Sequence, residues 1–168
     1  MNHSILVELA RALTREDFVA RLPDPVLVVL SELTTDEATG DENTQVGETV
    51  GGKPGKVRDD VPANFDALAV RKKRRGAEGE RITLGREKTC DIVVRTPGVS
   101  KLHACFLPGQ PLRVLDSGSQ NGTFVDGKRI PADQPVEVQP GAQLVFGDLA
   151  TRLISPAELY GLLKTPRS

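Results

Sequence analysis

The chain has 168 residues, of which 38% are hydrophobic and 27% are charged, and its formal net charge is −1. This length allows one ordinary domain with an extension, and the composition is that of a globular protein. The near-zero charge and the low aromatic content, 4%, disfavour nucleic acid as a ligand, because such sites need clustered cations and stacking rings. The 16 glycines and 12 prolines indicate many turns, which favours a β-rich fold.

The N-terminal part of the chain, residues 1–32, predicts two short helices followed by an apolar strip. Between residues 4 and 13 the apolar side chains recur at the spacing of one helical face. Thr14 can cap a second helix, with Asp17 at the third helical position. The run VLVVL, residues 26–30, fits either a short buried strand or a strip docked on another surface.

Residues 33–65 predict a disordered linker that is acidic and rich in threonine. No Lys or Arg occurs between residues 34 and 50, and such a segment buries too little apolar surface to offset its ordering entropy. The threonines open to phosphorylation by a kinase are Thr34, Thr35, Thr39, Thr44 and Thr49. A phosphorylated linker would allow self-capture or self-association, and a plain solubilising linker is the alternative.

From residue 66 the pattern changes to short apolar runs separated by turn residues, which predicts a β-sandwich over residues 66–154. The predicted strands are 68–71, 81–84, 92–94, 103–106, 112–115, 123–125, 128–130, 136–138, 143–146 and 151–154. In residues 155–168, Ser155 and Glu158 frame the start of a short C-terminal helix.

Cys90 and Cys105 are too few for a disulfide framework or a four-ligand zinc site, so both are interpreted as small buried side chains. No apolar run approaches the roughly 18 residues that span a bilayer, and the N-terminal pattern does not have the form of a secretory signal. We therefore expect a cytoplasmic protein without a membrane or metal partner.

Three separated motifs in the predicted sandwich place polar residues between strands. They are Gly85-Arg86, then Ser100-x-x-His103, and then Asn121-Gly122 followed by Thr123. In this order and spacing they resemble the forkhead-associated (FHA) domain, a phosphothreonine-recognition module. The resemblance covers about residues 67–154 and implies a mainly β fold, an eleven-stranded sandwich, here with short N-terminal helices and a short C-terminal helix.

The resemblance implies a phosphopeptide site formed by Arg86, Ser100, Lys101, Gln120 and Asn121. A phosphothreonine carries about −1.5 to −2 charges and three acceptor oxygens, so its site needs a cation with directed donors together with hydroxyl or amide donors. Arg86 offers a guanidinium fork, Ser100 a hydroxyl and Lys101 a second positive charge. The resemblance implies that the Asn121 amide holds the ligand backbone, and that no cofactor is needed.

The resemblance gives a supporting role to four other residues, namely Gly85, His103, Gly122 and Thr123. The two glycines meet backbone requirements of their turns, and His103 ties loops together by hydrogen bonds rather than acting in catalysis or metal binding.

Gln120 departs from the family pattern, which commonly has Thr or Ser at this position to contribute a hydroxyl to the phosphate. The Gln120 carboxamide still offers a donor, but the longer side chain costs more entropy to fix. This replacement predicts weaker phosphate binding, and a side chain that simply points to solvent is the alternative.

Other motifs support enzymatic or nucleic-acid functions less well. GETVGGKP, residues 47–54, ends in proline where a nucleotide-binding loop needs Ser or Thr. Ser100, His103 and Asp116 are the residue types of a hydrolytic triad, but no nucleophile motif surrounds Ser100. RKKRR, residues 71–75, is interpreted as an exposed hairpin between the first two predicted strands.

The sequence therefore predicts a non-catalytic adaptor that binds a phosphothreonine-containing protein in serine/threonine kinase signalling. Its partners would be the kinase or the substrates of that kinase. The alternative function is a phospho-independent structural or assembly protein that uses the same sandwich as a scaffold.

Overall fold

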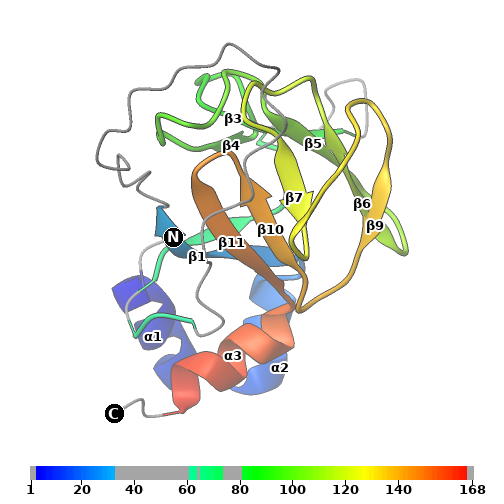
Figure 1. Cartoon of the computed structure of the whole chain (residues 1–168). Helices are drawn as coiled ribbons and strands as arrows, with labels where there is room; N and C mark the ends of the chain where they lie inside the picture. The colour runs from blue at the N-terminus through cyan, green and yellow to red at the C-terminus, as the bar shows by residue number, and fades with distance from the viewer. Residues whose placement is uncertain (1–2, 33–60, 64, 74–80, 166–168) are drawn as a thin grey trace.

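The computed structural model describes residues 3–32, 61–63, 65–73 and 81–165, which form two β-sheets and three helices. The larger sheet, in spatial order, consists of β2 (Ala67–Ala69), β1 (Val26–Glu32), β11 (Leu149–Ile154), β10 (Gln143–Phe146), β7 (Thr123–Val125) and β8 (Lys128–Arg129). The smaller sheet consists of β4 (Ile92–Val93), β3 (Ile82–Gly85), β5 (Ala104–Leu107), β6 (Leu112–Asp116) and β9 (Val136–Val138). The predicted mainly β, eleven-stranded sandwich is confirmed (Figure 1).

Large apolar side chains from both sheets form the core between them. Leu84 of β3 and Phe106 of β5 join Leu144 and Phe146 of β10 in one cluster, and all four are fully buried. The rings of Phe106 and Phe146 meet edge to face with their centroids 6.1 Å apart. Burial of each such side chain contributes about 1.5–3 kcal/mol, so this cluster holds the two sheets together.

Strand β1 lies inside the larger sheet, between β2 and β11, although it belongs to the N-terminal segment, residues 1–32, and not to the predicted sandwich range of 66–154. Val26 lies opposite Ile154 and Val29 opposite Thr151 in an antiparallel register. Leu27 belongs to the core between the sheets, whereas Val28 belongs to a second apolar cluster on the outer face. Because both faces of the strand are covered, its sequence is continuously apolar rather than alternating.

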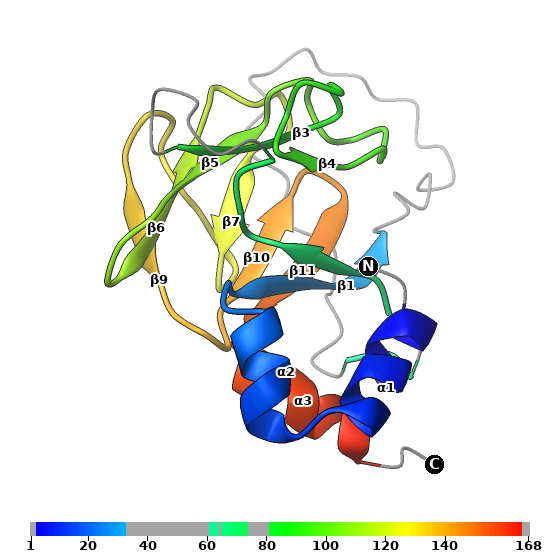
Figure 2. The same ribbon diagram turned by 180° about the vertical axis from the view of Figure 1, so that it is seen from behind.

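The three helices, α1 (His3–Ala12), α2 (Arg15–Arg21) and α3 (Pro156–Lys164), cover the outer face of the larger sheet (Figure 2). Their buried side chains include Leu6, Phe18 and Leu159, which pack with apolar residues of β1, β10 and β11. With seven to ten residues each, these described helices fall short of the length that crossing a membrane requires.

The predicted helix starts are confirmed by their capping bonds. Thr14 Oγ1 accepts a hydrogen bond from the N–H of Asp17 at 3.3 Å. Ser155 and Glu158 form a reciprocal capping box at the start of α3, in which each side chain accepts from the backbone N–H of the other. These local bonds satisfy N–H groups that the first helical turn leaves without partners.

The hairpin interpretation of residues 71–75 is wrong. Strand β2 belongs to the larger sheet and β3 to the smaller one, so the two strands are not paired as a hairpin requires. Residues 74–80 lie outside the described part of the structure. Lys72 pairs with Asp91 at 3.4 Å, and Lys73 Nζ donates to the carbonyl oxygen of Cys90 at 2.9 Å. The side chains of these two lysines therefore contact residues of the β-sandwich.

The predicted linker lies largely outside the described residues, and so do its five threonines. Cys90 and Cys105 are both buried and free, as expected from the sequence.

Candidate functional site

The loops that follow β3, β4, β6 and β10 meet at one end of the sandwich (Figure 1). The backbone N–H of Arg86 donates to the carbonyl oxygen of Ser100 at 3.0 Å, and the N–H of Gln120 donates to Ser100 Oγ at 3.1 Å. The N–H of Gly147 donates to the carbonyl oxygen of Gly122 at 3.0 Å. The fold thus brings together the three motifs that carry the family resemblance.

Two cations border these loops. Arg86 and Lys101 are exposed, and neither side chain forms a hydrogen bond or an ion pair with another described residue. Their backbones run close together, because the N–H of Glu87 donates to the carbonyl oxygen of Lys101 at 3.1 Å. A guanidinium and an ammonium with unused donors at adjacent positions favour an anionic ligand.

Gly85 allows the close approach of the loops that carry the cations. A Cβ at this position would lie 2.1 Å from the carbonyl oxygen of Lys101, far inside van der Waals contact. A larger residue would therefore separate the end of β3 from the loop before β5.

Ser100 has a hydroxyl that is anchored but still able to donate. Its oxygen accepts from the Gln120 N–H, and its own O–H has no acceptor among the described residues. The Gln120 side chain is exposed and makes no hydrogen bond to a described residue. The loop therefore presents the Ser100 O–H and, one residue before Asn121, a free carboxamide.

Asn121 ties two of the loops together. Its Nδ2 donates to the carbonyl oxygen of Gly98 at 2.9 Å, which fixes the direction of the amide. The residue is otherwise exposed, and its side-chain oxygen accepts no hydrogen bond from a described residue, so it remains available as an acceptor.

His103 is fully buried beneath the loops. Its Nδ1 accepts from the N–H of Ser100 at 3.0 Å, so Nε2 carries the proton and donates to the carbonyl oxygen of Gly122 at 2.9 Å. Burial lowers the pKa of the imidazole below its ordinary value, although the bond to Gly122 and the charge of Asp116 act in the opposite direction. These contacts are the ones that a structural role for the histidine requires.

Gly122 occupies a backbone conformation that favours glycine. Its φ is +86°, and a Cβ would lie 2.7 Å from Nε of Arg129 on β8. Its carbonyl oxygen accepts from both His103 and Gly147, so the turn is fixed from two sides.

Asp116 anchors the loop before β7, a role that was not predicted from the sequence. Its carboxylate accepts from the N–H groups of Gly118 and Ser119, both at 3.0 Å, from the Ser119 hydroxyl, and from Thr123 Oγ1 at 2.6 Å. Burial alone would raise the pKa of Asp116, but these hydrogen bonds outweigh it and hold the pKa below its ordinary value. An aspartate followed by Ser-Gly-Ser is typical of such a side-chain-capped turn, and this was the available signal.

The residues of the alternative hydrolytic triad are not arranged as one. The ring nitrogens of His103 contact the backbone of Ser100 and Gly122, and neither contacts Ser100 Oγ or the Asp116 carboxylate. The nucleophile and base of a triad need a direct side-chain hydrogen bond, which this geometry lacks.

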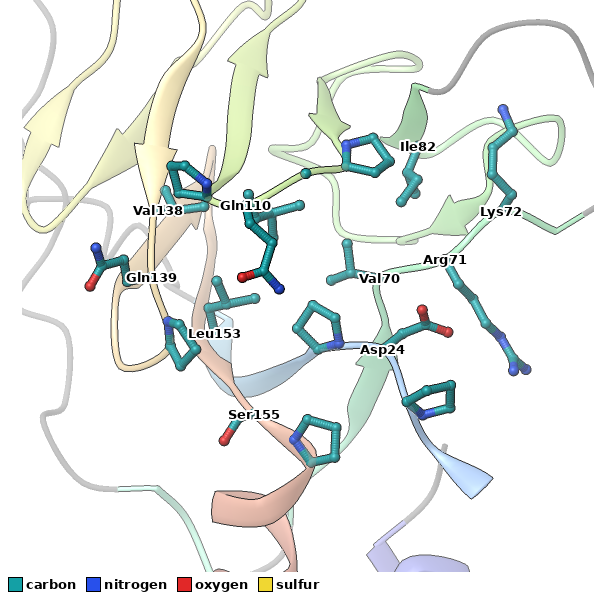
Figure 3. Close-up of a pocket in the computed structure, with 18 residues that line it drawn as sticks. Asp24, Val70, Arg71, Lys72, Ile82, Gln110, Val138, Gln139, Leu153 and Ser155 are labelled. Carbon is teal, nitrogen blue, oxygen red and sulfur yellow. The ribbon is translucent and has the colours of Figure 1, made fainter. Parts of the chain in front are cut away.

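A cavity of about 810 Å³ lies at the opposite end of the sandwich, where residues of the loops that join β5 to β6 and β9 to β10 form part of its lining (Figure 3). Its lining is mainly apolar and includes Val70, Ile82 and Leu153. The charged ends of Arg71 and Lys72 lie at its margin in Figure 3, and Lys72 is already paired with Asp91. The cavity therefore lacks the converging donors that a phosphate requires.

Comparison with known families matches residues 82–147 to the model of the FHA domain. A protein phosphatase 1 regulatory inhibitor subunit PPP1R8 homolog from Arabidopsis thaliana is 41% identical over 61 residues, which cover 35% of this chain and 16% of that protein. The DNA damage response protein kinase DUN1 of Saccharomyces cerevisiae is 31% identical over 74 residues, which cover 39% of this chain and 14% of the kinase. The chain thus spans less than a fifth of the length of either relative.

Among solved structures, the FHA domain of the CT664 protein from Chlamydia trachomatis is similar, with a TM-score of 0.49 and 16% sequence identity. The match covers 78% of this chain and 96% of that domain.

Proposed function

Because this chain is an FHA-domain protein, with residues 82–147 matching the domain, we propose that it is a phosphothreonine-dependent adaptor in serine/threonine kinase signalling. Its ligand would be a phosphothreonine-containing protein in the cytoplasm, either a kinase or one of the substrates of a kinase. One similar protein is itself a protein kinase, which supports this class of partner.

The observation that carries the proposal is the convergence of unused donors at one end of the sandwich. The Arg86 and Lys101 side chains and the Ser100 hydroxyl border the same hydrogen-bonded loops, and none of them donates to another described residue. A phosphate with about two negative charges and three acceptor oxygens fits this set. Asn121, held by its bond to Gly98, supports the contact with an extended ligand backbone.

The direct test is a titration of phosphothreonine peptides drawn from a degenerate library, with unphosphorylated and phosphoserine versions as controls. The proposal predicts binding that requires the phosphate and prefers phosphothreonine. A complete absence of phosphate-dependent binding would instead favour the second function, a phospho-independent assembly protein. This second function remains an alternative because the exposed residue at position 120 is Gln, which lacks the hydroxyl of Ser or Thr.

Gln120→Thr is expected to tighten phosphopeptide binding by roughly three- to tenfold. The shorter side chain places a hydroxyl next to the Ser100 hydroxyl at a lower entropic cost than the exposed carboxamide. Isothermal titration with one phosphothreonine peptide measures the change, and Gln120→Val, which lacks the hydroxyl but has a similar shape to threonine, is the matched control. Equal affinities for the threonine and valine variants would show that this position does not contact the phosphate.

We also propose that the chain binds itself through a phosphorylated linker threonine, either within one molecule or between two. Strand β1 ends at Glu32, which lies opposite Leu149, two residues after Gly147 in the loop that binds Gly122. Thr39 follows Glu32 by seven residues, and a chain reaches at most about 3.5 Å per residue, so self-capture is sterically possible.

Phosphorylation of the linker is therefore expected to weaken the binding of an added phosphopeptide at least about tenfold, or to produce dimers. Competition titration and light scattering measure the two effects, with the five threonines replaced by valine as the control. A phosphorylated chain that stays monomeric and binds the peptide as tightly as this control contradicts self-binding.

A further inference from the structure

Asp148 places an uncompensated negative charge beside the candidate site. It lies in the tight turn between β10 and β11, directly after Gly147. Its carboxylate packs against Gly98, since a Cβ on that glycine would lie 2.0 Å from Asp148 Oδ2. Asp148 is half-buried, and its side chain forms no hydrogen bond or ion pair with another described residue.

Gly98 connects this carboxylate to the proposed peptide-binding residue Asn121. The carbonyl oxygen of Gly98 accepts from Asn121 Nδ2 at 2.9 Å, and the same oxygen lies 2.1 Å from the position that a Cβ of Gly147 would occupy. Gly98 therefore contacts the Asn121 amide on one side and the turn that carries Asp148 on the other.

The side chains of Arg86, Lys101 and Asp148 consequently lie on two sides of the site. Arg86 and Lys101 border the Ser100 side, where their main chains are joined by hydrogen bonds, whereas Asp148 borders the Asn121 side across Gly98. Arg129 packs near Gly122 from β8, and no ion pair joins it to Asp148. A phosphate bound at the two cations would leave the carboxylate on the other side unneutralised.

We propose that Asp148 selects phosphothreonine ligands with a Lys or Arg side chain on the Asn121 side of the phosphorylated residue. This inference rests on the proposed phosphothreonine binding and adds to it a preference for the charge of a neighbouring residue of the ligand. A basic ligand side chain gains an attractive partner in a half-buried position, where salt screens less than in free solution. An acidic side chain at the same place is repelled, so the carboxylate acts by exclusion as well as by attraction.

The test is a scan in which Lys, Ala or Glu replaces each residue in turn on both sides of one phosphothreonine peptide, with affinity measured by fluorescence anisotropy. The expected result is one position, on one side of the phosphothreonine, at which Lys binds more tightly than Glu by roughly three- to tenfold. In Asp148→Asn, which preserves the shape of the side chain, this preference for Lys over Glu is expected to disappear.

Glu137→Gln is the matched control, because it removes the same charge from an exposed position on β9, next to the cavity at the other end of the sandwich. It is expected to leave the preference for Lys unchanged. Phosphate-dependent binding without a charge preference, or with one that persists in Asp148→Asn, overturns the role of Asp148 alone. Failure of every peptide to bind in a phosphate-dependent manner overturns the proposed function together with it.

Discussion

Replacing Arg86 by alanine is expected to lower the affinity for a phosphothreonine peptide by at least about a hundredfold and to leave the fold intact. The guanidinium is the planar donor of the site, and its hydrogen bonds to a phosphate are charge-assisted, each contributing about 1.5–3 kcal/mol. The free energy of unfolding is expected to change by less than about 0.5 kcal/mol, because the exposed side chain has no described partner. Isothermal titration and urea unfolding measure the two quantities.

Two further variants make this experiment specific. Arg113→Ala removes an exposed arginine from β6, beyond the recognition loops, and is expected to bind the peptide like the unmodified chain. Arg86→Lys keeps the charge but loses the planar fork, so an intermediate affinity is expected. If Arg86→Ala bound the natural partner as well as the unmodified chain does, the phospho-independent assembly function would be favoured.

Asp116→Asn is expected to reduce the free energy of unfolding by about 2–4 kcal/mol at neutral pH. The buried carboxylate accepts four hydrogen bonds, and an amide turns one of its oxygens into a donor that faces donors from Ser119 and Thr123. Because the loop from Asp116 to Thr123 carries Gln120 and Asn121, peptide affinity is expected to fall as well. Chemical unfolding followed by circular dichroism gives the stability, and titration gives the affinity.

The pH dependence separates this effect from a general packing defect. The folded-state pKa of Asp116 lies below its ordinary value, so its stabilisation is fully present above about pH 4 and is lost as the pH falls through the folded-state pKa. The asparagine variant lacks this contribution at every pH, so the two proteins should converge in stability in acid. Asp133→Asn is the control, because Asp133 is exposed and contacts Asp116 only through its backbone N–H, which donates to the Asp116 carbonyl oxygen. This variant should change the free energy of unfolding by less than about 0.5 kcal/mol. An equally stable Asp116→Asn at neutral pH would contradict the anchoring role.

Local chemistry made much of the fold predictable from the sequence. The helix starts at Thr14 and Ser155 follow from capping residues spaced within one turn, and the structure contains both capping bonds. Most strands of the sandwich lie within one or two residues of the predicted ranges, because turn residues separate short apolar runs. The three motifs converge as expected, since each lies in a loop at the same end of the sandwich.

The features that the sequence did not reveal depend on contacts between distant segments. The position of β1 between β2 and β11 is set by pairing with residues more than a hundred positions later, which no local pattern specifies. The assignment of β2 and β3 to different sheets follows from that same pairing, because β1 takes β2 as its neighbour. Asp148 meets Gly98 fifty residues away, and neither residue carries a motif that indicates the contact.

The position of β1 also determines how much of the chain is needed to fold the domain. The stretch that matches the family model, 82–147, contains neither β1 nor β11, yet these two strands pair along their length and supply side chains to both apolar clusters. A fragment cut to the family boundaries would leave β10 with an unpaired edge and would uncover Val145 on its outer face. The unit that folds cooperatively therefore includes β1, which precedes the predicted linker. Strands from both sides of that linker must pair before the loops of the candidate site are fully supported.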